Sequence, residues 1–423
     1  MRKKIRQVIV GNSAAGINAV RAIRESNHPC DIVLVSAENC NAYSPVLITH
    51  YLAGEIPREQ MFIVDSHFYE ENEVETIFGD KAVGLEPSKQ IVHLESGQKV
   101  TYDNLLIATG ASPRSLPGEA IEAGNVVSVW TLRDAEKLSE LAKRGREVIV
   151  IGGGLIGLQV ADALCKDGVQ LTILESLEQI LSRNADADCA KIIQYEMESR
   201  GVSTLCSVNV TGIENRGEKA IVILDSDQEL AADIVIINIG VEANISWLEG
   251  SGIRLNRGAL VDEFMRATFG NIFAAGDVTE VRNVITGQAD VLPGWGAACS
   301  QGRVAGANMV GQSETYPGGL MENITTLFGL PLAAVGSVIT TDGFSTEEIK
   351  LSDSQRRIYR KILLSGNRII GAILLGMAED AGVLRNLILN KVDVSAWKDE
   401  IGKTPMELRN LFVSQLTKSW SLF

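Results

Sequence analysis

Apolar and polar residues repeat one pattern twice along the 423-residue chain. Each copy begins with a β-branched run that predicts a buried strand and passes through a glycine turn into a run with helical periodicity. It then returns to a second apolar run that ends in an acid. The first copy reads QVIVGNSAAG over residues 7–16 and ends at Glu38; the second reads EVIVIGGGLIG over residues 147–157 and ends at Glu175. A duplicated strand–helix–strand unit predicts an α/β fold with two doubly wound parallel sheets.

Both glycine turns have the spacing of a dinucleotide-binding loop. They read GNSAAG from Gly11 to Gly16 and GGGLIG from Gly152 to Gly157. Glycine permits the tight turn, small residues let the backbone approach a pyrophosphate, and the following helix presents free N–H groups. One such match is weak evidence, because glycine-rich turns have other uses. Two matches, each in register with a strand, a helix and a terminal acid, favour two dinucleotide sites.

Two further apolar segments end in small-residue turns. Residues 103–110 read DNLLIATG and residues 271–278 read NIFAAGDV. Asp277 stands where a carboxylate can accept hydrogen bonds from a polyol, although an Asx turn is the simpler explanation for this aspartate taken alone.

Composition narrows the classes of function. The chain has 39 Lys and Arg against 53 Asp and Glu, a net charge of −14, which disfavours general binding of nucleic acid or anionic membranes. Its six cysteines form no CxxC pair, so neither a structural zinc site nor an iron–sulfur cluster is expected in this chain. The start lacks a signal-peptide core, and no apolar run has the length of a membrane span. A soluble, cytoplasmic protein without a metal is therefore expected.

Taken together, these motifs resemble the FAD/NAD(P)-dependent pyridine nucleotide-disulfide oxidoreductase superfamily. GNSAAG with Glu38 resembles its FAD fingerprint, LLIATG and IFAAGD its other flavin motifs, and GGGLIG with Glu175 its NAD fingerprint. The resemblance implies two Rossmann-like dinucleotide-binding domains and a C-terminal α+β interface domain. It implies the boundaries 1–112 and 236–318 for the FAD-binding domain, 113–235 for the NAD-binding domain and 319–423 for the interface domain.

The resemblance also assigns residues to the two cofactors. Glu175 is expected to bind ribose hydroxyls and to favour NAD(H), because a carboxylate repels a 2′-phosphate; otherwise it is a solvated strand end. A helix beginning near Trp295 either points its N-terminus at the flavin or only packs on the sheet. For FAD the positions are Gly11, Ser13, Ala14, Ala15, Gly16, Glu38, Ser44, Pro45, Thr49, Ala108, Thr109, Gly110, Gly276, Asp277 and Trp295. For NAD they are Gly152, Gly154, Leu155, Ile156, Gly157, Glu175 and Gly240.

Departures from the family pattern bear on the chemistry. Disulfide reductases of the family carry a redox cysteine near the first acid and a C-terminal His–Glu pair. Here Cys40 precedes the stretch expected to face the flavin, and no histidine follows residue 93. Ferredoxin reductases place a lysine near flavin N5, paired with a glutamate, where this chain has Thr49 and Gln159. Two neutral groups then replace an ion pair, unless a one-residue shift makes Thr49 a packing residue.

The features predict an NAD(H)- and FAD-dependent electron-transfer flavoprotein of the ferredoxin/rubredoxin reductase-like branch, without the redox cysteine. It resembles the NAD-reducing flavoprotein subunits of complexes such as phenylglyoxylate dehydrogenase or tungsten aldehyde oxidoreductase. That resemblance implies a hetero-oligomer with an iron–sulfur electron-transfer protein. A free-standing NADH–rubredoxin or NADH–ferredoxin reductase and a redox-sensing or assembly module remain open alternatives.

Two C-terminal features bear on such a partner. The basic run QRRIYRK at residues 355–361 is either a docking surface for an acidic iron–sulfur protein or a solvated strand edge. Residues 404–423 combine a capping box with apolar residues every four positions. They predict an amphipathic helix that either docks a partner or closes the fold.

Overall fold

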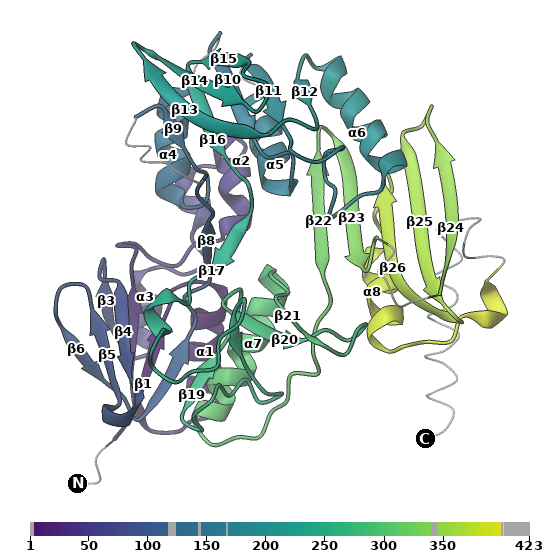
Figure 1. The fold of residues 1–423 in the computed structure, drawn as a ribbon. Coiled ribbons are helices and arrows are strands. Elements are labelled where there is room, and N and C mark those ends of the chain that lie inside the picture. The colour runs from purple at the N-terminus through teal and green to yellow at the C-terminus, as the bar shows by residue number, and fades with distance from the viewer. Residues whose placement is uncertain are drawn as a thin grey trace. The chain divides into compact units, whose positions relative to one another are not determined.

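The computed structural model describes residues 4–116, 124–142, 145–165, 168–339, 345–398 and 401. The chain divides into two compact units, each described by itself. Unit 1 comprises Met1–Pro113 and Val241–Gly319, and unit 2 comprises Arg114–Gly240 and Leu320–Phe423 (Figure 1). The helix predicted over residues 404–423 lies outside the described residues, and the three-domain division stays a prediction.

Unit 1 is built on a parallel five-stranded sheet. Its helices and strands are β1 (Ile5–Val10), α1 (Ala14–Glu25), β2 (Cys30–Ser36), η1 (Pro45–Leu47), α2 (Ile48–Leu52), α3 (Ser66–Glu71), β3 (Val74–Phe78), β4 (Ala82–Glu86), β5 (Ile91–Leu94), β6 (Lys99–Thr101), β7 (Asn104–Ile107), β8 (Ala111–Pro113), β17 (Val241–Ala243), β18 (Ala259–Leu260), β19 (Ile272–Ala274), β20 (Thr279–Arg282), β21 (Ala289–Asp290) and α7 (Trp295–Met309). The sheet order is β19-β7-β1-β2-β3. Apolar residues of β1, β2, β7 and β19 pack with those of β4, β5 and β6 into one core.

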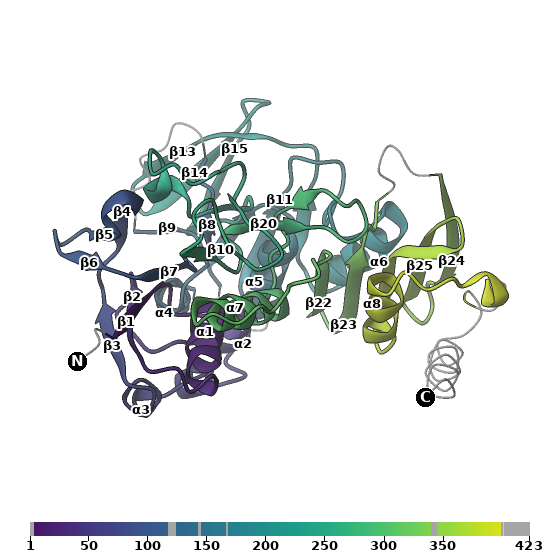
Figure 2. The ribbon, with the colours of Figure 1, turned by 90° about the horizontal axis from the view of Figure 1, so that it is seen from below.

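Helices α1 and α7 lie side by side against this sheet (Figure 2). The contact is close because α7 carries glycines where it meets α1. A Cβ at Gly302 would lie 2.1 Å from the Ala15 carbonyl oxygen, and one at Gly306 would lie 2.5 Å from that of Ala19. Any larger residue at these positions would push the two helices apart.

Unit 2 repeats the architecture of unit 1. Its helices and strands are β9 (Val126–Val127), α4 (Leu132–Leu141), β10 (Glu147–Ile151), α5 (Leu155–Cys165), β11 (Gln170–Leu174), α6 (Ala187–Ser199), β12 (Ser203–Leu205), β13 (Val210–Arg216), β14 (Lys219–Leu224), β15 (Glu229–Ala232), β16 (Ile234–Ile237), β22 (Glu322–Leu327), β23 (Leu330–Gly336), β24 (Thr346–Asp353), β25 (Ile358–Ser365), β26 (Arg368–Leu375) and α8 (Ala381–Leu389). The parallel sheet runs β12-β11-β10-β16-β9, and apolar residues of the β13-β14-β15 sheet join its core. The predicted duplication and fold class are confirmed, and the repeat extends to the small antiparallel sheet in each unit.

The C-terminal part of unit 2 is an antiparallel sheet in the order β22-β23-β26-β25-β24, with α8 packed on β26 and β23. Helices α5 and α6 bind the turn between β22 and β23. The Phe328 N–H donates to Asp162 Oδ2 at 2.9 Å, and Arg200 Nη2 donates to the Phe328 carbonyl at 2.6 Å. Both backbone groups of a buried turn residue are therefore satisfied by side chains of the preceding parallel-sheet part.

Ion pairs around the buried Lys361 join the same two parts of unit 2. Asp186, the N-cap of α6, accepts the Tyr359 hydroxyl at 2.6 Å and lies 3.4 Å from Lys361 Nζ. Lys361 also pairs with Glu348 at 2.8 Å. Burial alone would raise the pKa of Asp186, but the Tyr359 hydroxyl, the Cys189 N–H and the nearby lysines outweigh it and lower the pKa. The carboxylate is thus held ionised at the junction.

The two interpretations of the basic run 355–361 are a docking surface and a solvated strand edge, and neither interpretation holds for Arg360 and Lys361. The side chains of Arg360 and Lys361 are each only 6% exposed. Arg360 pairs with Asp380 at 2.9 Å, while Arg357 reaches Glu196 of α6 at 2.7 Å. Neighbouring strand residues point to opposite faces, and here both faces are covered. The end of the run at Arg360 and Lys361 is therefore an internal junction, whereas Arg356 is 78% exposed and Arg357 is 44% exposed.

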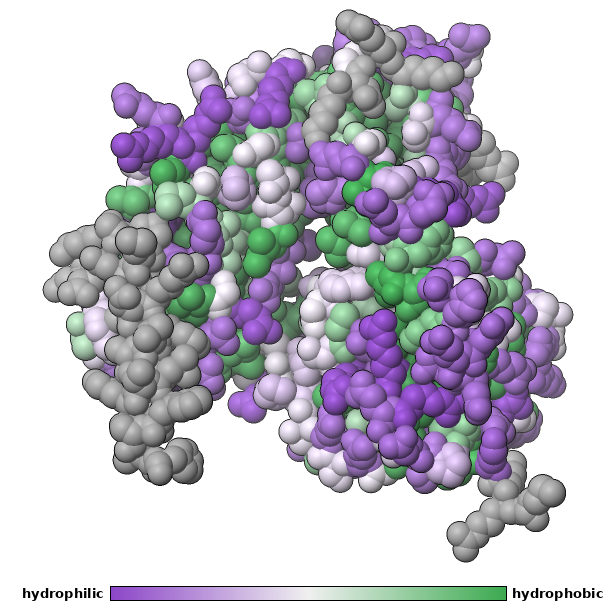
Figure 3. All heavy atoms as spheres, turned by 180° about the vertical axis from the view of Figure 1, so that it is seen from behind, coloured by the Kyte–Doolittle hydropathy of each residue, from purple (hydrophilic) through white to green (hydrophobic). Residues whose placement is uncertain are grey.

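No helix in the described ranges has both the length and the apolarity needed to cross a bilayer. Polar and charged residues occupy much of the face drawn in Figure 3, with apolar residues scattered among them.

The junction yields a test of stability. Asp186→Ala removes a helix cap and one of the two carboxylates beside buried Lys361, so it should lower the unfolding free energy by about 2–4 kcal/mol. Asp188→Ala, at an exposed position in the same helical turn, should change the unfolding free energy by less than about 0.5 kcal/mol.

The same ion pair predicts a pH dependence. Because the folded pKa of Asp186 is depressed, its contribution to stability is complete above the unfolded pKa of about 3.9 and is lost as pH falls through the folded value. Urea unfolding of the FAD-loaded protein between pH 3 and pH 8 measures both effects; equal destabilisation by the two variants would contradict the assignment.

Candidate functional site

The first glycine turn lies at the carboxyl end of β1 and requires its glycines. Gly11 has a φ of +130°, and a Cβ there would lie 2.0 Å from the Ala108 carbonyl oxygen at the end of β7. A Cβ at Gly16 would lie 2.0 Å from the Gly11 carbonyl oxygen. The turn thus brings α1 close to two central strands, which is the close approach that a dinucleotide-binding loop needs.

Helix α1 begins without a side-chain cap. Ser13 is the N-cap residue, yet its hydroxyl makes no capping hydrogen bond, and the small residues Ala14 and Ala15 form the first turn. The first N–H groups of a helix have no intrahelical acceptor. The N-terminus of α1 therefore offers backbone donors and a positive dipole end to an anion such as a pyrophosphate.

The second flavin motif forms a buried turn after β19. Gly276 has a φ of +85°, and its N–H donates to Gln301 Oε1 of α7 at 2.8 Å. Asp277 follows, and its Oδ1 accepts the Gly294 N–H at 3.2 Å. Burial raises the pKa of Asp277, which this single N–H only partly offsets. The carboxylate retains acceptor capacity for hydroxyl donors, as binding of a ribityl chain would require.

Asn244, which belongs to none of the predicted motifs, holds the turn after β7 through hydrogen bonds. Asn244 Nδ2 donates to the Thr109 carbonyl at 2.8 Å, and the Thr109 hydroxyl donates to the Asn244 carbonyl at 3.0 Å. The Asn244 N–H also donates to the Gly110 carbonyl at 2.9 Å. The two segments that connect the units, β8 and β17, are thereby held together beside Ala108, Thr109 and Gly110.

The remaining predicted FAD residues lie in the segment after β2 and at the start of α7. Glu38 is exposed, and its carboxylate accepts the Tyr43 hydroxyl at 2.9 Å. Ser44 is buried and precedes η1, which begins at Pro45. Thr49 is half-buried in α2, and the predicted helix start is confirmed, since α7 begins at Trp295.

The second glycine turn has the same geometry in unit 2. Gly152 has a φ of +108°, and a Cβ there would lie 2.2 Å from the Asn238 carbonyl oxygen. A Cβ at Gly157 would lie 2.1 Å from the Gly152 carbonyl oxygen. Gly154 is different, because a Cβ there would meet no atom within 4 Å. Its open surroundings leave the backbone accessible to a ligand at the N-terminus of α5, where Leu155 and Ile156 form the first turn.

Glu175 is held at the mouth of this turn by backbone donors. Its Oε2 accepts the Gly153 N–H at 2.8 Å, and its Oε1 accepts the Leu177 N–H at 2.9 Å. A Cβ at Gly153 would lie 3.1 Å from Glu175 Oε2, so the middle glycine of GGG also leaves room for the carboxylate. Gly240, after β16, has a φ of +106° that suits glycine.

Gln159 contacts the C-terminal sheet. Its Nε2 donates to Thr325 Oγ1 of β22 at 2.7 Å. Thr49 belongs to unit 1 and Gln159 to unit 2, so their joint place near flavin N5 stays a prediction.

None of the six cysteines forms a disulfide. Burial raises the pKa of five of them, which are Cys30, Cys165, Cys189, Cys206 and Cys299. A raised pKa keeps a thiol protonated and poorly nucleophilic near neutral pH.

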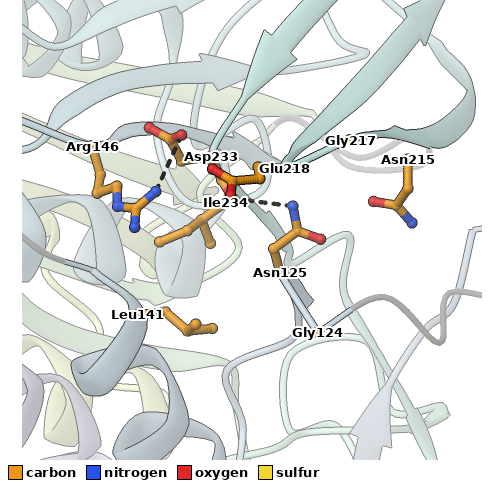
Figure 4. Close-up of a pocket in the computed structure, with 9 residues that line it drawn as sticks. All are labelled: Gly124, Asn125, Leu141, Arg146, Asn215, Gly217, Glu218, Asp233 and Ile234. Atoms are coloured by element: carbon orange, nitrogen blue, oxygen red, sulfur yellow. Dashed lines mark hydrogen bonds and ion pairs between the residues drawn. The ribbon is translucent and has the colours of Figure 1, made fainter.

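A cavity of about 560 Å³ lies at the other edge of the unit 2 sheet (Figure 4). Arg146 and Asp233 form an ion pair of 3.3 Å in its wall, and Asn125 donates to the Asp233 carbonyl at 3.2 Å. These residues directly precede β10, β16 and β9, whereas the glycine turn follows β10. Dinucleotides bind at the carboxyl ends of parallel strands, so this cavity is not the cofactor site.

Sequence patterns missed several residues that shape the two sites. Each of them makes a hydrogen bond to one of the predicted turns, to a predicted residue or to the loop after β2. They are Asn12, Tyr69, Asn244, Gln301 and Gly153. Only Gly153 had a sequence signal, as the extra glycine of GGG. The others are single polar residues whose partners are distant in sequence.

Both edges fit a dinucleotide. In each unit the turn admits only glycine at its closest approach, the helix N-terminus offers free N–H groups, and a carboxylate is placed with acceptor capacity left over. Unit 1 fits FAD through Asp277 and the α1 N-terminus, and unit 2 fits NAD(H) through Glu175 and Gly154.

Comparison with known proteins supports this interpretation. Residues 5–302 match the family model described as pyridine nucleotide-disulphide oxidoreductase, and residues 323–392 match the C-terminal domain of rubredoxin NAD+ reductase. The chain is 30% identical over 417 residues to the NADH-dependent phenylglyoxylate dehydrogenase subunit epsilon of Aromatoleum evansii, covering 96% of this chain and 97% of that one.

Two further relatives agree with this match. The chain is 26% identical to the assimilatory nitrate reductase electron transfer subunit of Bacillus subtilis over 94% of its own length, but it spans only about half, 51%, of that protein. The covalent putidaredoxin reductase–putidaredoxin complex contains a chain with the same fold, at a TM-score of 0.89, 23% identity and coverage of 97% and 98%. The resemblance predicted from the motifs is confirmed. This chain belongs to the pyridine nucleotide-disulphide oxidoreductase family and is an electron-transferring oxidoreductase that binds FAD and NAD(H).

Proposed function

We propose that this protein moves electrons between NAD(H) and an iron–sulfur protein, as the FAD-containing subunit of a multisubunit oxidoreductase. The near-complete overlap with the phenylglyoxylate dehydrogenase subunit carries the proposal, because that relative is named as one subunit of an NADH-dependent enzyme. The substrate of such a complex would be handled by another subunit.

A free-standing NADH–rubredoxin or NADH–ferredoxin reductase is the second candidate. The match of residues 323–392 to the C-terminal domain of rubredoxin NAD+ reductase favours it. Both candidates share the same chemistry in this chain and differ in what accepts the electrons.

The residues of this chain have binding and orienting roles in the proposal. The α1 N-terminus and Asp277 hold FAD, while the α5 N-terminus and Glu175 hold NAD(H). When bound, the two cofactors exchange an electron pair, and the flavin passes electrons on one at a time. Thr49 and Gln159 are proposed to lie near the flavin as neutral groups. The lack of any histidine after residue 93 supports a reaction without a cysteine–histidine pair.

The choice of nicotinamide cofactor is proposed to depend on Glu175. Its carboxylate, fixed by the Gly153 and Leu177 N–H groups, can accept the ribose 2′-hydroxyl and would repel a 2′-phosphate. NADH should therefore reduce the flavin much faster than NADPH. Glu175→Ala should narrow that ratio by about tenfold or more, or about 1.4 kcal/mol.

Anaerobic stopped-flow reduction of the bound flavin by each nucleotide measures this ratio. Glu178→Ala, an exposed acid three residues further on, is the matched control and should leave the ratio unchanged. Equal rates with NADH and NADPH in the unaltered protein would contradict the role of Glu175.

The proposed acceptor can be tested on the isolated chain. The FAD-loaded protein, reduced anaerobically with NADH, is mixed either with a ferredoxin carrying two [4Fe–4S] clusters or with rubredoxin. Transfer to an iron–sulfur partner, which the complex subunit and a free-standing NADH–ferredoxin reductase have in common, predicts rapid electron delivery to the ferredoxin, measured as bleaching of the cluster absorbance together with recovery of the flavin bands.

Many turnovers with rubredoxin and none with ferredoxin would favour the free-standing rubredoxin reductase. Flavin reduction without transfer to either protein would contradict both candidates and support a redox-sensing or assembly module. Omitting NADH gives the baseline for each acceptor.

A further inference from the structure

A buried tyrosine links the two loops on the FAD side of unit 1. Tyr69 lies in α3, outside every dinucleotide motif, and its hydroxyl donates to Asn12 Oδ1 at 3.0 Å. The same hydroxyl accepts the Ala42 N–H at 3.0 Å. Asn12 is the residue that follows Gly11 in the first glycine turn, and Ala42 lies in the loop that carries Glu38 and Ser44.

Asn12 strengthens the link with its other amide atom. Asn12 Nδ2 donates to the Cys40 carbonyl at 3.2 Å. Asn12 Nδ2 thus binds the loop 37–44 directly, and Asn12 Oδ1 holds the same loop through Tyr69. Since a hydroxyl has one proton to donate and Tyr69 uses it on Asn12 while accepting from Ala42, the direction of each hydrogen bond is fixed.

The loop held in this way has no regular secondary structure between β2 and η1. At its far end, the Ala42 carbonyl accepts the Ile63 N–H at 2.9 Å, and the Ser44 N–H donates to the Met61 carbonyl at 2.9 Å. These bonds attach the loop to residues 61–63. The Asn12–Tyr69 link instead joins the loop to the glycine turn, and its hydrogen bonds are buried or half-buried.

The Tyr69 ring is itself well fixed. It makes edge contacts with Phe68 and Phe78, with ring centres 5.4 Å apart in both cases. Burial raises the pKa of the hydroxyl, which the Ala42 and Asn12 hydrogen bonds only partly offset, so the proton that Asn12 accepts stays in place at neutral pH. Removing the hydroxyl alone would keep the ring packing and break the link.

We propose that Tyr69 is a positioning residue for FAD: through Asn12 and Ala42 it sets the spacing between the first glycine turn and the loop that carries Glu38, both of which are proposed to contact FAD. The adenosine half of FAD must contact both segments at once. A loop that is free to move away from Gly11 would bind FAD more weakly, because the cost of ordering it would fall on binding.

The test compares FAD release from the holoprotein in matched variants. Tyr69→Phe should raise the FAD dissociation constant about tenfold or more, measured by the rise in flavin fluorescence on dilution, and should change the visible circular dichroism of the remaining bound flavin. Asn12→Ala should act similarly. Because both remove the same link, the double variant should be little weaker than the weaker single variant. Tyr195→Phe, at a tyrosine that is 67% exposed, should have no effect.

An unchanged FAD dissociation constant in Tyr69→Phe, or effects of the two changes that multiply independently, would overturn the proposal. A lower thermal midpoint of the apoprotein with unaltered FAD release would likewise leave Tyr69 a purely structural role. Asp277→Asn distinguishes an error in the role of Tyr69 from an error in the FAD site itself. If Asp277→Asn also leaves the FAD affinity unchanged, the assignment of FAD to this edge of the unit 1 sheet is wrong.

Discussion

The fold depends on a close approach that only glycine permits. In each unit the strand that enters the dinucleotide turn passes so near its neighbour that a Cβ would lie about 2 Å from a backbone carbonyl oxygen, that of Ala108 in unit 1 and that of Asn238 in unit 2. No rearrangement of a flexible side chain could relieve such a contact, because the obstructing atom is backbone. The helix must therefore leave the sheet at this point and in this direction. The N-terminus of the helix then meets the carboxyl ends of the same strands, and in α1 it carries no side-chain cap. Anion binding and sheet packing therefore have the same structural cause.

This constraint explains how much could be predicted from the sequence. The glycine turns, their strands and helices and the fold class follow from local spacing, because each of these features lies within a few residues of the motif. The small antiparallel sheets that complete both cores had no such signal. Their strands are short, and their alternating pattern is common in any exposed sheet. The duplication was therefore visible at the cofactor turns and hidden everywhere else.

The basic run at residues 355–361 shows a second limit of sequence patterns. A cluster of four cations normally indicates a solvated or docking surface, because burying a charge is costly unless it is paired. Here the acids that pair with Arg357, Arg360 and Lys361 are Asp186, Glu196, Glu348 and Asp380, the first two more than 150 residues earlier in the chain. Charge patterning reveals the cations but not their partners. The same holds for Asn12 and Tyr69, which are 57 residues apart and belong to no common motif.

Within unit 2, Gln159 connects the helix that follows the second glycine turn with the C-terminal sheet. It lies two residues after the last glycine of the second turn, on the helix whose N-terminus is proposed to bind NAD(H), and its amide donates to Thr325 in the C-terminal sheet. One turn later, Asp162 accepts the N–H of Phe328 from the same strand pair. A glutamate at position 159 would place a second negative charge on this face of α5, next to Asp162 and beside a threonine that offers a single proton. A neutral amide makes the contact without that repulsion. A neutral residue at position 159 thus has a reason in how helix α5 holds the C-terminal sheet, whereas its place beside the flavin stays a prediction.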